Sequence, residues 1–149
     1  MSARLRDDKQ YFRCAMMRYI ASDIRNSVFQ DIFDRLEESG FIDDPDLEIS
    51  EGGRLAFKYK KNSIIGIGFK KSSGDQKSKL KSLAGFNCVL IEEADEIGED
   101  EFMQLDDSLR TAKSDILVIL QLNPPDKNHW IIKRWFNLVD VGIPGFYKA

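Results

Sequence analysis

The hydrophobic and polar positions along the chain predict a strand followed by a helix near the N-terminus. Residues 11–17 are mostly apolar and predict a buried strand. Residues 24–36 then carry an apolar residue at every fourth position, which places these side chains along one face of a helix. Ser22 or Asp23 can cap the start of this helix, and Gly40 is suited to end it.

The middle of the chain changes to short extended segments. Residues 47–50, 54–59 and 64–69 predict three strands, with turns at Gly52-Gly53 and at Lys61-Asn62-Ser63. Strands this close together pair as hairpins, so this part of the chain is expected to be antiparallel.

The second half of the chain returns to alternating strands and helices. Residues 87–91 and 115–122 are continuous apolar runs, and residues 99–112 and 128–136 predict helices. Apolar runs without alternation are typical of strands buried on both faces of a parallel sheet. The expected fold is therefore α/β, with a mostly parallel sheet flanked by helices and a short antiparallel insertion over residues 45–70.

Composition and charge are those of one solvated domain with two electrostatically different parts. The chain has 149 residues, of which 42% are hydrophobic, and a formal net charge of -3. Residues 58–81 contain eight lysines and one acid, whereas residues 92–107 contain nine acids and no base. This separation predicts one basic and one acidic surface, while the net charge argues against a simple nucleic-acid coat protein.

Two cysteines, Cys14 and Cys88, lie within the predicted buried strands. No Cys-x-x-Cys or Cys/His cluster accompanies them, so a site for zinc is not expected, and a reducing cytoplasm is the natural setting. No run of about 18 apolar residues predicts a membrane span, and residues 1–10 do not resemble a signal peptide.

The sharpest chemical signal is the pair of carboxylates that follows the strand over residues 87–91. Glu92 and Glu93 stand where ligands bind in open α/β sheets, at the carboxyl end of a strand. One acid could hold hydrated Mg²⁺, and the other could polarise a water that attacks a γ-phosphate. Strand alternation is expected to point the two side chains in different directions. The alternative is an ordinary solvated acidic turn.

Two weaker signals stand nearby. Asn123 follows the strand over residues 115–122, where an amide could sense a γ-phosphate, although Asn-Pro is also a common turn. Lys81 ends the basic segment and could neutralise phosphate charge on a nucleotide or on DNA, although most of these lysines are expected in a solvated loop.

Other residues receive structural interpretations. His129 is the only histidine, and no serine stands in a nucleophile-elbow context, so Ser-His or Cys-His catalysis is not expected. Trp130 and Trp135 flank a helix and are interpreted as packing anchors. Gly66-Ile67-Gly68 is too short for a phosphate-binding loop and indicates close packing of a strand instead.

Six segments follow one another along the chain in a recognisable order. They are Arg18, Asp23-Ile24-Arg25-Asn26-Ser27-Val28-Phe29, Lys79-Leu80-Lys81-Ser82-Leu83-Ala84-Gly85, Ile91-Glu92-Glu93-Ala94-Asp95, Ser108-Leu109-Arg110 and Leu122-Asn123-Pro124. In this order and spacing they resemble the ATPase domain of phage terminase large subunits, most closely the branch whose Walker B motif reads Ile-Glu-Glu-Ala. The resemblance extends over residues 11–136.

The resemblance implies a P-loop ATPase that forms a ring at the portal and pumps DNA into an empty capsid. It implies that Glu92 coordinates Mg²⁺ through water and that Glu93 is the catalytic glutamate. Asn123 would lie in the motif that couples hydrolysis to movement, and Arg18 near the nucleotide or the core. Lys81 stands roughly where some members carry an arginine finger that acts on the neighbouring subunit's ATP.

Two departures from the family pattern shape our expectations. Glu92 replaces the more common aspartate. The G-x-x-x-x-G-K-[ST] loop is not found upstream, because residues 1–19 contain no glycine. We therefore expect a partial ATPase domain whose sheet is incomplete at the N-terminus, with either low stability or an exposed edge that self-associates. We also expect weak ATP binding and no hydrolysis by the chain alone. The expected parts are a strand–helix unit at 10–40, the insertion at 45–70 and the Walker B and coupling core at 80–136.

The resemblance also implies partners. These are double-stranded DNA, the small terminase subunit, the portal protein and further copies of the chain, in the cytoplasm of a bacterial host and without a membrane. Two alternatives remain open from the sequence: a non-catalytic DNA- or protein-binding module, and a fragment of another P-loop ATPase such as a helicase.

Overall fold

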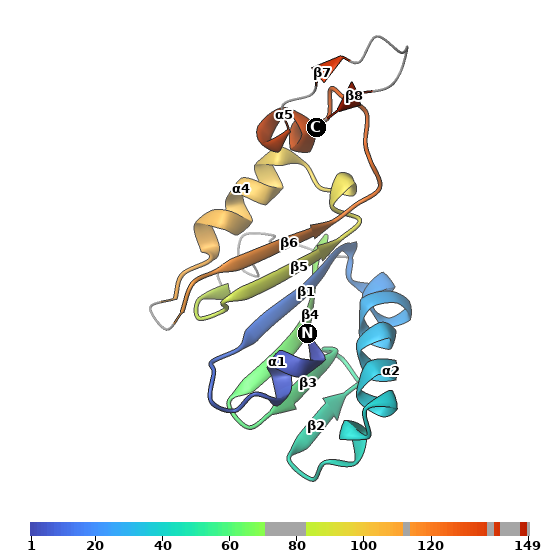
Figure 1. Cartoon of the computed structure of the whole chain (residues 1–149), viewed down its shortest axis with the longest axis vertical. Helices are drawn as coiled ribbons and strands as arrows, with labels where there is room; N and C mark the ends of the chain where they lie inside the picture. The colour runs from blue at the N-terminus through green and yellow to red at the C-terminus, as the bar shows by residue number, and fades with distance from the viewer. Residues whose placement is uncertain (71–82, 112–113, 137–138, 141–146, 149) are drawn as a thin grey trace.

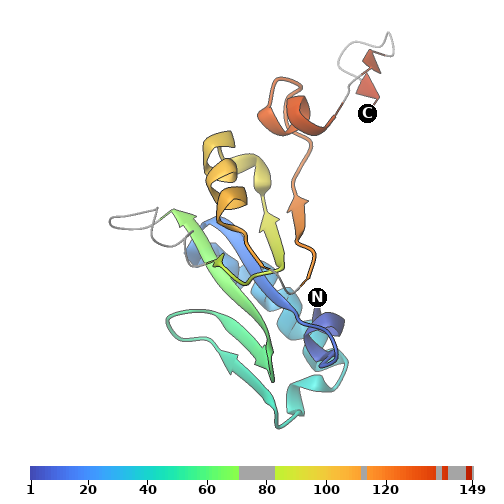
Figure 2. The ribbon, with the colours of Figure 1, turned by 90° about the vertical axis from the view of Figure 1, so that its left-hand side faces the viewer.

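The chain folds around a six-stranded sheet with helices on both faces (Figures 1 and 2). The strand order is β2-β3-β4-β1-β5-β6, and a separate two-stranded sheet pairs β7 (Val139–Asp140) with β8 (Tyr147–Lys148). The structure is a computed structural model, and it describes residues 1–70, 83–111, 114–136, 139–140 and 147–148.

Four strands form the parallel part of the sheet: β1 (Arg13–Ile20), β4 (Asn62–Lys70), β5 (Cys88–Glu92) and β6 (Leu117–Gln121). β1 lies between β4 and β5 and runs parallel to both, and β5 runs parallel to β6. The continuous apolar sequences of β1 and β5 suit these positions because helices cover both faces there. The predicted α/β fold with a mostly parallel sheet is confirmed.

The short strands in the middle of the chain extend the same sheet. β2 (Leu47–Ser50) pairs antiparallel with β3 (Ala56–Tyr59), and β3 pairs antiparallel with β4. The turn before β4 is formed by Lys60 and Lys61, and Lys60 has a φ of 52°. The turn predicted at Lys61-Asn62-Ser63 is therefore misplaced, because Asn62 already pairs with Tyr59 in the ladder.

The predicted N-terminal helix is present but interrupted. A 3-10 turn at Ala21–Ile24 and a π turn at Arg25–Phe29 precede the regular helix α2 (Gln30–Glu38). Ser27 breaks the regular backbone with φ -129° and ψ -110°. Its hydroxyl donates to the carbonyl of Asp23 at 2.9 Å, a back-bond that often bends helices. Gly40 adopts the left-handed conformation (φ 65°) just beyond the helix, as predicted.

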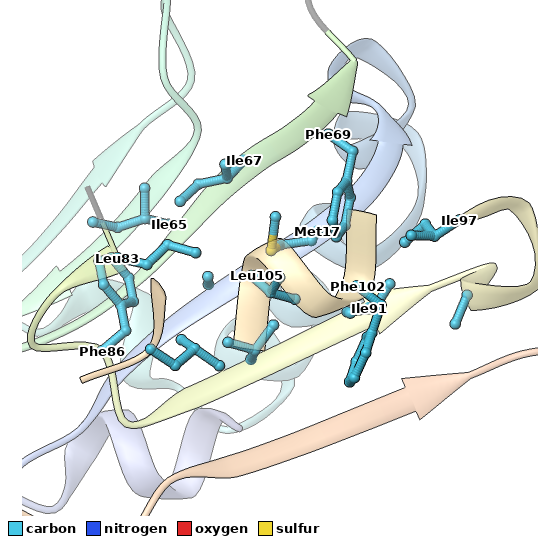
Figure 3. Close-up of a cluster of buried hydrophobic side chains, with 14 of the residues drawn as sticks. Met17, Ile65, Ile67, Phe69, Leu83, Phe86, Ile91, Ile97, Phe102 and Leu105 are labelled. Carbon is cyan, nitrogen blue, oxygen red and sulfur yellow. The ribbon is translucent and has the colours of Figure 1, made fainter. Parts of the chain in front are cut away.

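Two buried cores lie on opposite faces of the sheet, because alternate residues of β1 and β5 point to opposite sides. The α2-side core contains Leu5 of α1 (Ser2–Arg6) together with Cys14, Met16, Cys88 and the apolar face of α2. The α4-side core, shown in Figure 3, lies under α4 (Glu99–Ser108) and α5 (Trp130–Trp135). Its largest members are Met17, Ile65, Ile67, Phe69, Leu83, Phe86, Ile91, Ile97, Phe102, Leu105, Leu109 and Ile131.

The two glycines of β4 allow close packing, as the sequence indicated. A Cβ on Gly68 would lie 2.5 Å from the Cβ and 2.7 Å from the backbone nitrogen of Ala21. A Cβ on Gly66 would lie 3.3 Å from the Cβ of Leu55 and 3.4 Å from Cγ2 of Ile24. The segment after β1 can therefore approach β4 only because Gly68 has no side chain.

Two buried asparagines tie the start of β1 to its neighbours. The side-chain oxygen of Asn62 accepts from the backbone N–H of Phe12 at 2.9 Å, and its amide donates to the carbonyl of Asp7 at 2.8 Å. The side-chain oxygen of Asn87 accepts from the N–H of Arg13 at 2.8 Å. Both contacts satisfy backbone groups where β1 enters the core.

β6 lies at the edge of the sheet, with β5 as its only partner among the described strands. The side chains of Leu117 and Ile119 are 43% and 37% exposed, and Ile116 just before the strand is 39% exposed. The prediction that this strand is buried on both faces is therefore wrong. Its apolar sequence suits a central strand, but the fold leaves one edge and part of one face uncovered.

Candidate functional site

The carboxyl ends of β1 and β5 lie side by side in the middle of the sheet. Their parallel register runs from Cys14 opposite Cys88 to Met17 opposite Ile91. One residue further, the same register places Arg18 beside Glu92, both directed to the face opposite Met17 and Ile91. The sheet therefore brings together an arginine and a glutamate that lie far apart in the sequence.

Arg18 bridges the two consecutive carboxylates. Its Nε lies 3.5 Å from Oε2 of Glu92, and its Nη2 forms an ion pair with Oε2 of Glu93. The third guanidinium nitrogen, Nη1, donates to the backbone carbonyl of Asp23 at 3.4 Å. The side chains of Arg18 and Glu92 are each 15% exposed and that of Glu93 is 44% exposed, so Glu92 is the inner and Glu93 the outer carboxylate.

The ion pairs keep the guanidinium charged. Burial by itself lowers the pKa of Arg18, but the hydrogen bond to Glu93 and the negative charges of Glu93 and Glu92 outweigh it. The pKa of Arg18 therefore lies above its ordinary value. Arg18 therefore supplies one positive charge opposite two neighbouring carboxylates.

Glu92 retains an unused acceptor. Its Oε2 is buried and, although it lies near Arg18, it accepts no well-aligned hydrogen bond from the described residues. Buried carboxylate oxygens normally have partners, so this atom has capacity for another ligand. Mg²⁺ takes oxygen ligands from one or two protein carboxylates and completes its shell with water and phosphates, so Glu92 fits this ion. No cluster of three or more metal-ligating side chains occurs among the described residues.

Glu93 departs from the strand geometry that the sequence predicted. Its backbone is left-handed, with φ 51° and ψ 50°, and it stands between β5 and the 3-10 turn Ala94–Glu96. Both carboxylates therefore reach Arg18, and the expectation that alternation would separate them is wrong, because alternation ends at Glu92. A left-handed conformation costs a residue with a Cβ about 1–2 kcal/mol, so neighbouring contacts must hold Glu93 in place.

The structure places Asn123 but does not describe Lys81. Asn123 is exposed and lies two residues beyond Gln121, which pairs with Glu92 in the ladder. It is therefore placed at the same edge of the sheet as the carboxylates. Lys81 lies outside the described residues.

His129 and Trp130, at the start of α5, make contacts near Glu93 that the sequence does not predict. The Trp130 indole donates to the carbonyl of Ile97 at 2.7 Å, and the His129 ring contacts the carbonyl of Asp95 at 3.2 Å. Both carbonyls belong to the turn that follows Glu93. No pattern in the sequence indicates these contacts, because they join segments more than 30 residues apart through backbone carbonyls.

Comparison with known proteins identifies the family. The family model described as phage terminase large subunit matches residues 3–143, nearly the whole chain. No curated protein sequence matches the chain. None of the described helices is long and apolar enough to cross a membrane.

Solved structures of the large terminase from a thermophilic bacteriophage have the same fold. One crystal form superposes with a TM-score of 0.64 at 14% identity and covers 87% of this chain. The complexes of that terminase with ADP and with ATP-gamma-S superpose with TM-scores of 0.61 and 0.57, at 14% and 12% identity, again over 87% of this chain. This chain spans 30% of the length of the first two and 29% of the third.

Proposed function

The chain belongs to the phage terminase large subunit family, and we propose that it carries the acidic half of the ATP-hydrolysing site of a DNA-packaging motor. The observation that supports this most directly is the pair Glu92 and Glu93, joined by Arg18 at the carboxyl end of a central parallel strand. Parallel α/β sheets bind their ligands at that edge.

The two carboxylates differ in ways that suit two different tasks. Glu92 is the inner residue, and its buried Oε2 has no hydrogen-bond donor in the part of the chain that the structure describes, so it is the candidate for holding Mg²⁺. When bound, Mg²⁺ would neutralise charge on the phosphate oxygens. Glu93 is the more exposed of the two, so its carboxylate can reach a water molecule and accept its proton.

Arg18 restrains Glu93 in the observed arrangement. Nη2 of Arg18 occupies Oε2 of Glu93, so a water that donates to this oxygen has to displace the guanidinium. Glu93 therefore has to exchange Arg18 for a water before it can act as a base. Arg18 could turn towards the phosphates at that moment, since a guanidinium binds phosphate oxygens as well as it binds carboxylates.

The other proposed roles follow the resemblance. Asn123, at the same edge of the sheet, is the candidate for the motif that couples hydrolysis to movement. Lys81 is the candidate for a residue that acts on the ATP of a neighbouring subunit. We propose double-stranded DNA, the small terminase subunit, the portal protein and further copies of the chain as partners, in the cytoplasm of the bacterial host.

Turnover by this chain alone is not expected. Among the described residues, no glycine-rich loop presents a row of backbone N–H groups to a triphosphate, and such a cradle supplies much of the affinity in P-loop enzymes. We therefore expect weak nucleotide binding without hydrolysis. ATP turnover that Glu93→Gln abolishes would contradict this expectation.

Thermal unfolding with and without Mg-ATP tests the proposal. At a nucleotide concentration about 10 times Kd, which is a realistic limit for weak binding, the folded state is stabilised by about 1.4 kcal/mol. For a chain of this size that corresponds to a rise in Tm of roughly 3–6 °C. Glu92→Gln should remove the part of this rise that depends on Mg²⁺, because it replaces the charged ligand with a neutral amide of the same shape.

Glu96→Gln is the matched control, because Glu96 is an exposed carboxylate in the adjacent turn. It should leave the rise in Tm unchanged. An equal rise in wild type and Glu92→Gln would remove Glu92 from the site, and no rise at millimolar nucleotide would contradict nucleotide binding by the chain. A salt-dependent DNA affinity without any nucleotide effect would instead favour the DNA-binding alternative, with a log–log slope of about 0.9 for each phosphate neutralised.

A further inference from the structure

The turn that follows Glu93 is connected to α5 by two side chains that precede or begin that helix. Trp130 donates its indole N–H to the carbonyl of Ile97 at 2.7 Å, and Nε2 of His129 lies 3.2 Å from the carbonyl of Asp95. Both acceptors are backbone atoms, so the two contacts act on the path of the main chain rather than on a neighbouring side chain.

The proton on the His129 ring can be assigned from its second contact. Nδ1 of His129 accepts the backbone N–H of Ile131 at 3.3 Å, which caps the start of α5. A nitrogen that accepts in this way carries no proton, so in the neutral ring Nε2 carries it. His129 therefore donates to the Asp95 carbonyl while it caps the helix, and each role depends on the same tautomer.

The turn itself transmits these contacts to Glu93. The N–H of Glu96 donates to the carbonyl of Glu93 at 3.0 Å, and the N–H of Ile97 donates to the carbonyl of Ala94 at 3.3 Å. Ala94 and Ile97 are buried at 1% and 2% exposure, so the turn is also anchored in the α4-side core (Figure 3). The left-handed backbone of Glu93 is thus continuous with a turn whose carbonyls are held by α5.

α5 is firmly placed at its other contacts. The Trp130 ring packs against Phe102 of α4 with centroids 5.3 Å apart, and Ile131 is buried at 1% exposure. Arg134 pairs with Glu99 at the start of α4 at 3.7 Å. The helix can therefore serve as a fixed support against which the turn is positioned.

We propose that His129 and Trp130 are positioning residues for Glu93: they hold the Glu93–Ile97 turn so that the carboxylate faces Arg18, and they link its conformation to the segment that follows β6. This inference rests on the proposed role of Glu93. That segment contains Asn123 and leads directly into α5, so a change of backbone at Glu93 and a movement of this segment are coupled through two hydrogen bonds.

NMR of the full chain tests the link without requiring catalysis. The two tryptophans give two indole N–H signals, and Trp135→Phe assigns them. Arg18→Gln and Glu93→Gln should each shift the Trp130 indole signal while the Trp135 signal stays in place. Trp130→Phe should shift the backbone amide signal of Glu93, because it removes the N–H donor while keeping an aromatic ring against Phe102.

Two further variants separate positioning from packing. Trp135 packs on Trp130 with ring centroids 5.5 Å apart, so Trp135→Phe keeps an aromatic ring in that contact. It removes an indole N–H that has no bond to the turn among the described residues, so it should leave the Glu93 amide unmoved. His129→Asn retains a side chain that can cap α5 but is too short to reach Asp95, so it should shift the Glu93 amide in a chain that still folds cooperatively. This second variant keeps the test decisive if Trp130→Phe does not fold.

The outcomes distinguish the link from the proposed ATPase site. If Mg-ADP does not bind but the reciprocal shifts occur, the link stands and the proposed function fails. If Mg-ADP binds but neither Trp130→Phe nor His129→Asn moves the Glu93 amide, the link is wrong. A loss of stability in these variants without any change at Glu93 would show that the two residues only pack the helix.

Discussion

Replacing Arg18 with glutamine should destabilise the fold and release Glu93. The change removes the positive charge and shortens the side chain, so Glu92 and Glu93 remain next to each other without a counter-charge. Two neighbouring negative charges disfavour the folded state, whereas the wild-type arginine stabilises it by pairing with both acids.

The size of the effect follows from burial. Breaking a fully buried ion pair costs about 3–5 kcal/mol, and exposed pairs contribute about 0–1 kcal/mol. Arg18 and Glu92 are each 15% exposed, but Glu93 is 44% exposed and its interaction is weakened by solvent. We therefore expect a total loss of about 2 kcal/mol, of which about 1 kcal/mol belongs to the pair with Glu93. In thermal unfolding this corresponds to a fall in Tm of about 4–8 °C.

Urea unfolding followed by tryptophan fluorescence measures this loss, and a double-mutant cycle assigns it. If the Arg18–Glu93 pair is real, Arg18→Gln should cost less in the Glu93→Gln background than in wild type, with a coupling of about 1 kcal/mol. The coupling should shrink in about 1 M salt, where the Debye length falls to about 3 Å.

Arg35→Gln provides the matched control. Arg35 pairs with Glu38 at 3.1 Å, but the two side chains are 74% and 65% exposed. This substitution should change the free energy of unfolding by less than about 0.5 kcal/mol. Equal effects of Arg18→Gln and Arg35→Gln, or a coupling with Glu93 near zero, would show that Arg18 does not restrain Glu93.

Two other predictions follow from packing. Gly68→Ala should destabilise the fold by about 1–3 kcal/mol in urea unfolding, because its Cβ would meet the backbone of Ala21 at 2.7 Å. Gly52→Ala is the control and should change stability by less than about 1 kcal/mol, since nothing lies within 4 Å of its Cβ. Ile119→Lys should reduce concentration-dependent association in light scattering, because it places a charge on the open edge of β6. Met103 on α4 has the same 37% exposure, and Met103→Lys should leave association unchanged. Equal effects of the two substitutions would show that the chains do not associate through the edge of β6.

Much of the fold could be predicted because local sequence patterns control it. The strand at 47–50 was predicted with the bounds that β2 has, and Gly40 ends its helix in the left-handed conformation that only glycine adopts easily. The close packing inferred for Gly66 and Gly68 is confirmed by the short distances to Ala21 and Ile24. For β2 and Gly40 the relevant constraint lies in the residue itself or in its immediate neighbours, whereas for Gly66 and Gly68 the missing side chain indicates close packing but not its partner.

Two failures arise from contacts between distant segments, and a third from the turn that follows β5. Asn62 was assigned to a turn because asparagine favours turns, but its side chain is buried and bonds Phe12, 50 residues away. The strand at Leu117–Gln121 was expected to be buried on both faces, because an apolar run does not reveal whether a neighbouring strand is present. The backbone of Glu93 was expected to continue the strand alternation, yet the following turn gives it a φ of 51°.

Residue order and hydrophobic periodicity are sufficient to predict the class of sheet, the position of Glu92 and Glu93 at a strand end, and the resemblance that the family match bears out. These are local properties of the chain. The contacts of Arg18 with both carboxylates, and those of His129 and Trp130 with the turn that follows Glu93, are visible only in the folded molecule. Strand register and helix docking set those contacts. Both depend on how segments that are distant in the sequence pack against each other, so the pattern of any one segment cannot predict them.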